Sequence, residues 1–302
     1  MPLGKVGDDI AGTFVLREMR AVGIDTRFVE VVTGKPTLFS VCFQYPDGSG
    51  GNITTANSVA AELSEENIDH AESLLQAIDR RTIALLLPEV PLGCRRHFLG
   101  VARQKGAFCA ASFVSGEVGD AKRLGMFDQL SMVSLNEEEA ADLVGEAFTP
   151  SSPEVFLDKL FRLVVLQYPQ LLAVMSAGKN GAYFVDRSRW SYSPAPKAKV
   201  ASTAGAGDCL LGGMLSAMAA GISLPSAQRR VTTEPVLENA LDFGVLLASY
   251  KVSSPHTIHP DASLDELLRF TRQLGISVVS EIEQLVSDKE IVKSEPLMNP
   301  AM

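Results

Sequence analysis

Cysteine is scarce in this chain of 302 residues, and the four that it has, Cys42, Cys94, Cys109 and Cys209, lie far apart. No two of them form a Cys-x-x-Cys motif, which disfavours a disulfide framework and a zinc site. A chain of this length can build a continuous hydrophobic core without such cross-links. We therefore expect buried, reduced thiols and a cytoplasmic protein.

Long hydrophobic runs are also absent. The longest apolar stretch, residues 209–224, is shorter than the roughly 20 residues that a membrane-spanning helix needs, and Gly212 and Gly213 interrupt it. The opening MPLGKVGDDIAG has no apolar segment and contains two acidic residues, unlike a secretory signal. The sequence therefore predicts neither a membrane span nor export.

Positive charge is in deficit, with 27 lysines and arginines against 36 acidic residues and a net charge of −9. The basic residues are scattered and form no stripe, so the chain has no electrostatic footprint for a nucleic acid. With 46% hydrophobic and 21% charged residues, the composition is that of a globular protein. We expect no nucleic-acid or membrane partner.

Short hydrophobic runs alternate with helical patterns from Ser64 onward. The predicted strands are residues 83–87, 107–111, 132–135 and 171–176. The predicted helices are residues 94–104, 137–144 and 153–165, together with a single helix behind Ser64 that carries Ile68, Ala71, Leu75 and Ile78. Strands that are apolar on both faces and alternate with helices indicate a parallel sheet covered on both sides. The sequence therefore predicts an α/β fold.

The first part of the chain has a different pattern. Residues 10–21 have apolar positions at helical spacing and are followed by Gly23, a typical helix stop. Residues 28–32 and 37–45 are rich in β-branched and aromatic side chains and are joined by Thr-Gly-Lys-Pro. We expect a helix followed by a small antiparallel β unit.

A glycine-rich segment precedes a hydrophobic helix in residues 201–221, ASTAGAGDCLLGGMLSAMAAG. Glycines let a backbone approach a ligand closely, and a helix start offers unpaired N–H groups and the positive end of the helix dipole. Asp208 fits two interpretations that the segment alone leaves open. It stabilises the helix start, or it accepts the proton of a hydroxyl that attacks a phosphoryl group held by the amides. The rest of the segment is typical of a buried helix that packs tightly against the sheet.

Two further segments follow predicted strands. Ser-Ala-Gly-Lys-Asn-Gly-Ala begins at Ser176, and Asn136 and Glu139 lie three positions apart in Asn-Glu-Glu-Glu. The carboxyl ends of strands line the usual ligand crevice of an open α/β sheet. Asn136 and Glu139 also suit a helix capping box, so a structural and a functional interpretation both stand.

These motifs occur in a recognisable order. Asn-x-x-Glu at residue 136, Gly-x-x-Gly at residue 178 and Thr-x-Gly-Ala-Gly-Asp at residue 203 together resemble the ribokinase-like, or PfkB, family of sugar and nucleoside kinases. Residues 5–12 are similar to that family's Val-Gly-x-Asp-x-x-Gly segment, and residues 21–25 to its Gly-Val-Asp element. The resemblance extends over residues 6–254, and the combination is far more specific than any single motif.

The resemblance implies a ribokinase-like, Rossmann-type three-layer α/β/α sandwich with a small β-sheet lid. Residues 1–26 and 55–286 would form the nucleotide-binding core, and residues 27–54 a partial lid. Residues 287–302 lack periodicity for most of their length and are expected to form a loosely ordered tail.

The resemblance also implies roles on the nucleotide side of an active site. Asp208 would be the general base. The amides that would form an anion hole are those of Gly205, Ala206 and Gly207. The residues that would border ATP are Ser176, Gly178 and Gly181. Asn136 and Glu139 would organise the water shell of Mg²⁺ and the phosphates.

On the acceptor side the resemblance implies less. Glu89 stands where relatives carry a carboxylate near the substrate, and Asn52 would lie at the inner edge of the lid. The family's Gly-Gly-x-x-x-Asn substrate motif and its first strand have no counterpart, because the Gly-Gly-Asn that ends at Asn52 has a different context. An open strand edge must be covered or paired, so we expect an incomplete sequence or a homodimer formed through the lid or the exposed edge.

Two smaller departures concern phosphate handling. Ser202 stands where the family's Asp-Thr-x-Gly-Ala-Gly-Asp motif begins with aspartate, and residues 111–115 lack the aspartate and arginine of an Asp-Pro-Asn-x-Arg-like segment. Loss of the arginine does not affect Asp208.

The sequence therefore predicts an ATP-dependent kinase that phosphorylates a hydroxyl of a sugar or nucleoside and uses Mg²⁺. The sequence does not decide whether the kinase also uses a monovalent cation. The alternative is a non-catalytic descendant of the family that binds a nucleotide or a partner protein, an interpretation motivated by the missing substrate motif.

Overall fold

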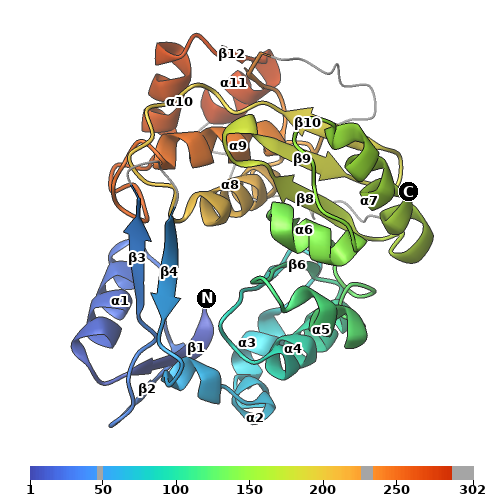
Figure 1. Ribbon diagram of the computed structural model, residues 1–302. Helices are drawn as coiled ribbons and strands as arrows, with labels where there is room; N and C mark the ends of the chain where they lie inside the picture. Colours follow the sequence, from blue (N-terminus) through green and yellow to red (C-terminus); the bar gives the residue numbers. More distant parts are fainter. Residues whose placement is uncertain (46–49, 226–233, 288–302) are drawn as a thin grey trace. The chain divides into compact units, whose positions relative to one another are not determined.

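The computed structural model describes residues 1–45, 50–225 and 234–287, so the predicted tail, residues 287–302, lies outside this range except for its first residue. The chain divides into two compact units, Met1–Cys109 and Ala110–Met302. Figure 1 draws the first unit in blue to teal and the second in green to red.

The first unit opens with two parallel strands, β1 (Leu3–Gly7) and β2 (Phe28–Val32), connected by helix α1 (Ile10–Ala21). The bounds predicted for the helix are confirmed. The prediction that residues 28–32 pair with the strand that follows them is wrong, because β2 pairs with β1, with Leu3 opposite Phe28. A parallel pairing needs a crossover connection, and α1 provides it.

Asp9 ties the start of α1 to a distant part of the chain. Its carboxylate accepts a hydrogen bond from the N–H of Gly12 (2.8 Å), which caps the helix. It also accepts from the N–H and the hydroxyl of Thr37, at 2.8 and 2.6 Å. The Thr37 hydroxyl in turn accepts from the N–H of Gly7 at 2.9 Å. These contacts explain why an aspartate follows the β1 strand in this sequence.

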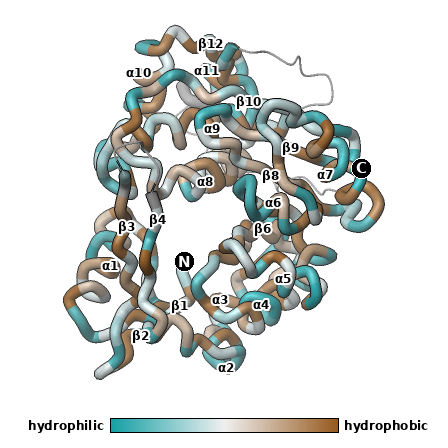
Figure 2. The backbone as a smooth tube through the Cα atoms, in the orientation of Figure 1, coloured by the Kyte–Doolittle hydropathy of each residue, from teal (hydrophilic) through white to brown (hydrophobic). Residues whose placement is uncertain are grey.

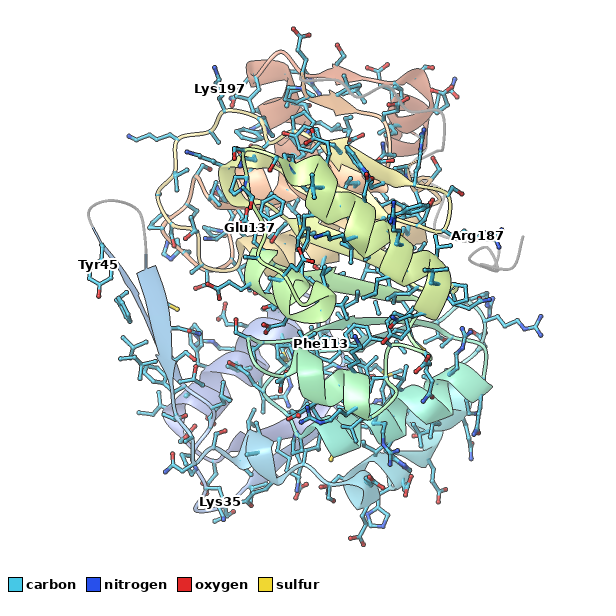
Figure 3. The ribbon with its side chains drawn as sticks, turned by 45° about the vertical axis from the view of Figure 1, so that its right-hand side comes forward. Lys35, Tyr45, Phe113, Glu137, Arg187 and Lys197 are labelled. Carbon is cyan, nitrogen blue, oxygen red and sulfur yellow. The ribbon has the colours of Figure 1, made fainter. Side chains whose placement is uncertain are left out.

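A two-stranded antiparallel hairpin follows, made of β3 (Ser40–Gln44) and β4 (Gly50–Thr54). Its register places Val41 opposite Ile53 and Cys42 opposite Asn52. Because side chains alternate along a strand, one face is polar and the other hydrophobic. The apolar face of the hairpin consists of Phe39, Val41, Phe43, Tyr45 and Ile53, whose exposed fractions run from 40% to 69%. Figure 2 colours hydrophobic residues brown along β3, and Figure 3 labels Tyr45 just after the end of that strand.

The remainder of the first unit begins with a short 3₁₀ helix, η1 (Val59–Glu62), and the helices α2 (Glu65–Asp69) and α3 (Glu72–Ala77). The Ser64 cap is confirmed, since its side chain accepts from the N–H of Asn67. The prediction of one continuous helix behind it is wrong, because the helix stops after Asp69 and restarts at Glu72. No glycine or proline marks this break.

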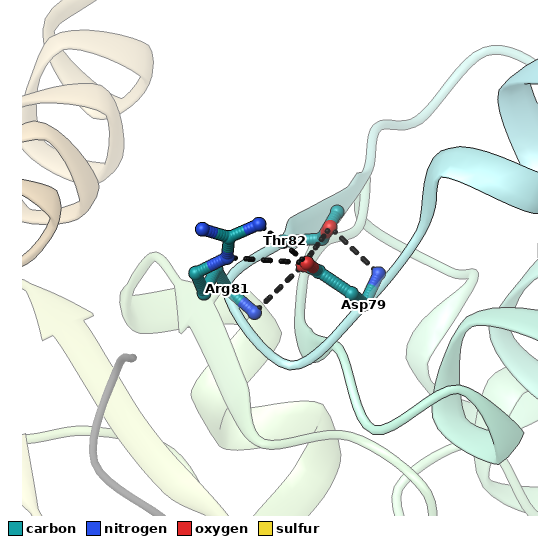
Figure 4. A network of polar contacts seen from close by, with 3 residues as sticks. All are labelled: Asp79, Arg81 and Thr82. Carbon is teal, nitrogen blue, oxygen red and sulfur yellow. Dashed lines mark hydrogen bonds and ion pairs between the residues drawn. The ribbon is translucent and has the colours of Figure 1, made fainter. Parts of the chain in front are cut away.

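A compact turn leads from these helices into β5 (Ile83–Leu86), which is followed by α4 (Leu92–Gln104). Figure 4 shows the turn: the Asp79 carboxylate accepts hydrogen bonds from the N–H and guanidinium of Arg81 and from the Thr82 hydroxyl. This contact lowers the pKa of Asp79, with the Arg81 N–H as the largest cause. The carbonyl of Thr82 then accepts the N–H of Phe108 at 2.9 Å.

The second unit is built on a mixed sheet with the strand order β10-β9-β8-β7-β6. The strands are β6 (Phe108–Ser112), β7 (Met132–Leu135), β8 (Leu172–Ser176), β9 (Ala182–Val185) and β10 (Trp190–Ser193). β6, β7 and β8 run parallel, as predicted, whereas β9 and β10 are antiparallel to their neighbours. The predicted parallel arrangement therefore holds for β6, β7 and β8 and does not extend to β9 and β10, because the connection from β8 to β9 is too short for a crossover.

Helices cover both faces of this sheet. Those of the second unit are α5 (Val118–Arg123), α6 (Glu137–Val144), α7 (Pro153–Gln167), α8 (Ala206–Ala219), α9 (Ala240–Lys251), α10 (Leu264–Gln273) and α11 (Ser280–Ser287). α6 packs on β7 and β8, α7 on β9 and β10, and α9 also on β9 and β10. Figure 1 shows α6 and α7 in front of the strands and α8 and α9 behind them. A short parallel pair, β11 (Val236–Leu237) and β12 (Ser277–Val278), completes the unit. The layers confirm the predicted α/β class.

Helix α8 packs closely on α9, and glycines permit it. A Cβ at Gly244 would lie 2.5 Å from the carbonyl oxygen of Leu210, and a Cβ at Gly213 would lie 3.0 Å from the Cα of Gly244. The small residues predicted to pack this helix against the sheet thus pack it against α9 instead. Among the described residues, none of the helices is both long and apolar enough to cross a membrane.

The four cysteines are unpaired thiols. Cys94 and Cys109 are buried as predicted, and burial raises the pKa of Cys109 to about 11. Cys42 is exposed on the hairpin and Cys209 is half-buried, so the prediction of burial is wrong for these two.

Candidate active site

The carboxyl edge of the sheet in the second unit gathers most of the predicted nucleotide-side residues. β7 and β8 run parallel with Leu135 opposite Met175, so Asn136 and Ser176 follow at the same edge. β9 returns from that edge with Ala182 opposite Ser176. The turn that joins them, residues 177–181, contains both Gly178 and Gly181.

This turn depends on a glycine. Gly181 has φ +101°, and a Cβ there would lie 2.0 Å from the carbonyl oxygen of Ser193 and 2.7 Å from the nitrogen of Ala195. The Ala177 N–H donates to the carbonyl of Gly181 at 2.8 Å and closes the turn. Gly178 is exposed with φ +52°. Close backbone packing therefore requires glycine at position 181, whereas at position 178 the positive φ alone favours it.

Asn136 and Glu139 form a complete capping box at the start of α6. The Glu139 N–H donates to the Asn136 side-chain oxygen at 2.9 Å. In return, the Asn136 N–H and side-chain amide donate to the two carboxylate oxygens of Glu139, at 2.9 and 2.8 Å. The structural interpretation of this pair is therefore confirmed, and it leaves room for a second role through water because Asn136 is exposed.

Glu139 is a buried carboxylate, with 8% of its surface exposed. Burial raises the pKa of its carboxyl group, and the negative charges of neighbouring acidic residues raise it further: Glu138, Asp142 and Glu117. The hydrogen bond from the Asn136 N–H acts in the opposite direction and lowers it. Figure 3 labels Glu137 at the beginning of the same helix, where burial also raises its pKa. The first turn of α6 thus concentrates carboxylates at the sheet edge.

The described residues contain no group of three or more metal-binding side chains arranged around one point. Mg²⁺ usually keeps several waters and is bound by one or two carboxylates together with substrate phosphates. The carboxylates at the start of α6 fit such indirect binding.

The start of α8 has the features of an anion site. Its N-cap, Gly205, is left-handed with φ +80°, and a Cβ there would lie 2.5 Å from the carbonyl oxygen of Thr257. The Ala206 N–H donates to the carbonyl of Thr203 at 3.1 Å, so this member of the predicted anion hole is already engaged in a turn. The N–H groups of Gly207 and Asp208 have no backbone acceptor among the described residues.

Asp208 is the third residue of α8 and is exposed. Within the described part of the chain, no hydrogen bond or ion pair engages its carboxylate. An exposed carboxylate next to open N–H groups at a helix start can accept a proton while the amides and the helix dipole hold an anion.

Sequence reasoning missed one charged residue near this loop. Lys251, at the end of α9, is fully buried, and its Nζ donates to the carbonyl oxygen of Ser202 at 3.0 Å. A lysine in the last turn of a helix is ordinary, so nothing in the sequence distinguished it.

The two acceptor-side candidates belong to the first unit. Glu89 follows β5 and is exposed, with φ +70°; among the described residues no other non-glycine has a positive φ. Such a backbone conformation is strained for glutamate and tends to occur at functional sites. Asn52 is exposed in β4, on the polar face of the hairpin opposite Cys42.

Comparison with known proteins agrees with these observations. Residues 2–263 match the model of the pfkB family of carbohydrate kinases. A ribokinase from Dictyostelium discoideum is 23% identical over 218 residues, which are 69% of this chain and 67% of that protein.

Solved structures share the fold. A ribokinase from Cryptococcus neoformans var. grubii in complex with ADP superposes with a TM-score of 0.69 at 18% identity, covering 89% of this chain and 81% of that one. A Burkholderia thailandensis nucleoside kinase in complex with inosine gives a TM-score of 0.66 at 16% identity, covering 91% and 80%. The predicted ribokinase-like fold is confirmed.

Proposed function

The chain belongs to the pfkB family of carbohydrate kinases, and from this premise we propose that it transfers the γ-phosphoryl group of ATP to a hydroxyl of a sugar or nucleoside. One observation supports the proposal most directly. Asp208 places an exposed carboxylate in the first turn of α8, beside the open N–H groups of Gly207 and of Asp208 itself. A phosphoryl transfer needs a proton acceptor next to a site that stabilises negative charge.

In this proposal each element of the second unit has one task. The Asp208 carboxylate takes the proton of the attacking hydroxyl. The amides of the Gly205–Gly207 segment, the open one of Gly207 above all, hold the phosphoryl oxygens. Ser176, Gly178 and Gly181 border the nucleotide at the sheet edge. Mg²⁺, when bound, neutralises charge on the phosphates, and Asn136 and Glu139 would hold it through water.

The acceptor is assigned only by class. The relatives include a ribokinase and a nucleoside kinase that binds inosine, and both ligand types offer hydroxyl groups. We propose that Glu89 accepts hydrogen bonds from acceptor hydroxyls, because it is exposed and held in a strained backbone conformation. Asn52 would make a further polar contact from the hairpin.

The experiment that tests the proposed function is Asp208→Asn. Loss of a general base lowers the rate by roughly 10²–10⁴-fold, and nucleotide affinity should stay close to that of the wild type. Glu266→Gln is a matched control, because Glu266 is likewise the third residue of its helix, α10, behind the Ser263 cap. Acceptors from a panel of sugars and nucleosides should be assayed with both variants.

Wild-type turnover in Asp208→Asn would exclude Asp208 as the base. The non-catalytic alternative predicts something else: ATP raises the melting temperature of the wild type, while no acceptor shifts it and no turnover occurs. A thermal-shift panel with ATP, Mg²⁺ and the same acceptors therefore separates the two functions.

We also propose that the protein is a homodimer formed through the apolar face of the hairpin. An isolated two-stranded hairpin is marginally stable at best, and this one exposes hydrophobic side chains together on a single face. A second copy of the hairpin would cover that face.

A further inference from the structure

Lys251 is an unusual residue for its position. None of its surface is exposed, although it ends helix α9. Burying an ammonium group is costly unless it is compensated, so lysine is almost never fully buried without partners. Its Nζ donates to the backbone carbonyl of Ser202 at 3.0 Å. The side chain therefore reaches from α9 to the segment that precedes the start of α8.

The same part of the chain makes further contacts with that segment. The carbonyl of Val252 accepts the N–H groups of Ala201 and Ser202, at 2.7 and 3.2 Å. Further on, the Thr257 backbone lies so close to Gly205 that no side chain fits there. Residues 251–257 thus touch the α8 loop, residues 201–205, at its beginning and at its end.

The charge of Lys251 also acts on the first turn of α8. Burial raises the pKa of the half-buried Cys209 thiol, the charge of Asp208 raises it further, and the charge of Lys251 lowers it. Cys209 therefore lies within electrostatic range of both charged groups. The ammonium therefore adds a positive charge near the positive end of the α8 helix dipole.

We propose that Lys251 is a positioning residue for the anion site: its buried ammonium holds the α8 loop in shape and contributes the positive charge that favours bound phosphate. This inference rests on the proposed function, since it concerns the same site.

The test measures the affinity of Mg-ADP by calorimetry in the wild type, Lys251→Met and Ser249→Ala. Lys251→Met removes the charge and the hydrogen bond, and the dissociation constant should rise about tenfold or more. Ser249→Ala is the matched control: Ser249 is also buried in α9, but its hydroxyl bonds within the helix to the carbonyl of Val245. Its affinity should remain that of the wild type.

Chemical rescue separates a positioning role from a merely structural one. In Lys251→Ala, ammonium or ethylammonium ions can refill the space beside the Ser202 carbonyl and should recover part of the lost affinity. Choline at the same ionic strength is too large and should not. The wild type should respond to none of them.

The outcomes are distinct. A wild type that binds no nucleotide overturns the proposed function itself. A wild type that binds, together with a folded Lys251→Met of equal affinity, overturns only the role of Lys251. Should Lys251→Met fail to fold, Lys251→Arg decides: it keeps the charge, so affinity within about threefold of the wild type supports the proposal, and a tenfold loss in a folded protein contradicts it.

Discussion

The second unit, Ala110–Met302, and the first unit, Met1–Cys109, differ in where their candidate residues get their positions. In the second unit a helix start, a tight turn and a capping box place every candidate at a defined point of the backbone. In the first unit Glu89 and Asn52 lie on exposed backbone segments, one strained and one in a hairpin with an uncovered hydrophobic face.

The difference teaches why the candidate residues of the second unit are recognisable from the sequence and those of the first unit are not. A backbone position such as Gly181 or Gly205 tolerates a single residue type, so it leaves a motif. A position that makes an exposed polar contact tolerates several residue types, so it leaves no motif in the sequence. The first unit follows the same rule where its backbones touch, because a Cβ at Gly7 would lie 2.0 Å from the carbonyl oxygen of Lys35.

The largest expected effects come from these close backbone contacts. Gly181→Ala should lower the free energy of unfolding of the second unit by about 3 kcal/mol, and Gly7→Ala should lower that of the first by a similar amount. The single tryptophan, Trp190, lies in β10 and reports on the second unit by fluorescence, while circular dichroism reports on both units. In urea, Gly181→Ala should therefore move the fluorescence transition and Gly7→Ala only part of the dichroism signal.

Gly212→Ala serves as the control for these two variants. Gly212 lies inside α8, and apart from its chain neighbours and the nearby backbone of its own helix, no described atom would lie within 4 Å of a Cβ added there. Alanine there should stabilise the second unit by about 0.5–1 kcal/mol. If Gly7→Ala and Gly181→Ala both shifted a single common transition, the two units would unfold as one and the comparison between them would lose its meaning.

Acid should affect the two units in opposite directions. Hydrogen bonds from the Thr37 hydroxyl and then from backbone N–H groups lower the pKa of Asp9 to about 2. Asp9 therefore stabilises the first unit at pH values above 3.8, the ordinary pKa of aspartate. This stabilisation is lost as the pH falls from 3.8 to about 2. Burial raises the pKa of Glu139 above 4.5, so the second unit loses stability as the pH rises from 4.5 through the raised value.

Two variants isolate these contributions. Asp9→Asn should flatten the acid dependence below pH 3.8 and leave the Trp190 transition unchanged. Glu139→Gln should flatten the dependence of that transition on pH above 4.5. Urea titrations at a series of pH values, read by fluorescence and circular dichroism, provide the measurement. Equal slopes in a variant and the wild type would mean that another carboxyl group is responsible.

Much of the fold was predictable because its signals are local. The bounds of α1, β7 and α6 match the predicted ones, since caps and apolar spacing act within a few residues. Strand pairing was harder to predict, because β2 pairs with β1 through contacts between residues far apart in the sequence, which local patterns do not indicate. The break between α2 and α3 also lacks a local cause, as neither glycine nor proline occurs there.

The candidate site shows the same division. The logic of strand ends placed Asn136, Ser176 and Gly181 at one edge, which the strand register bears out. The burial of Lys251 could not be predicted from the sequence, because it results from tertiary packing, whereas a lysine at the end of a helix is ordinarily exposed. The contact between Asp9 and Thr37 escaped prediction for the same reason, since it joins residues distant in the chain.

Glu89 sharpens the comparison, because its strain is expected to serve function and not stability. Glu89→Gly removes the cost of the left-handed conformation, about 1 kcal/mol or more. Glycine, however, loses more conformational entropy on folding than glutamate does, and this offsets part of the gain. The first unit should gain about 0.5 kcal/mol, while kcat/KM for the acceptor should fall about tenfold. Glu89→Asn, whose residue type tolerates this conformation, controls for the loss of the carboxylate alone. A variant with full activity would remove Glu89 from the acceptor site.

The smallest expected change in stability concerns the apolar face of the hairpin. Val41 and Ile53 are 53% and 69% exposed, so replacing both by lysine should alter the free energy of unfolding by no more than about 0.5 kcal/mol. The same replacement should abolish dimerisation, because it would place four like charges in the proposed interface between two copies. Leu166→Lys, at a 79% exposed position of α7, should leave the dimer intact. Sedimentation velocity over a range of concentrations distinguishes these results. A wild type that stays monomeric throughout would show that the exposed face of the first unit serves something other than self-association.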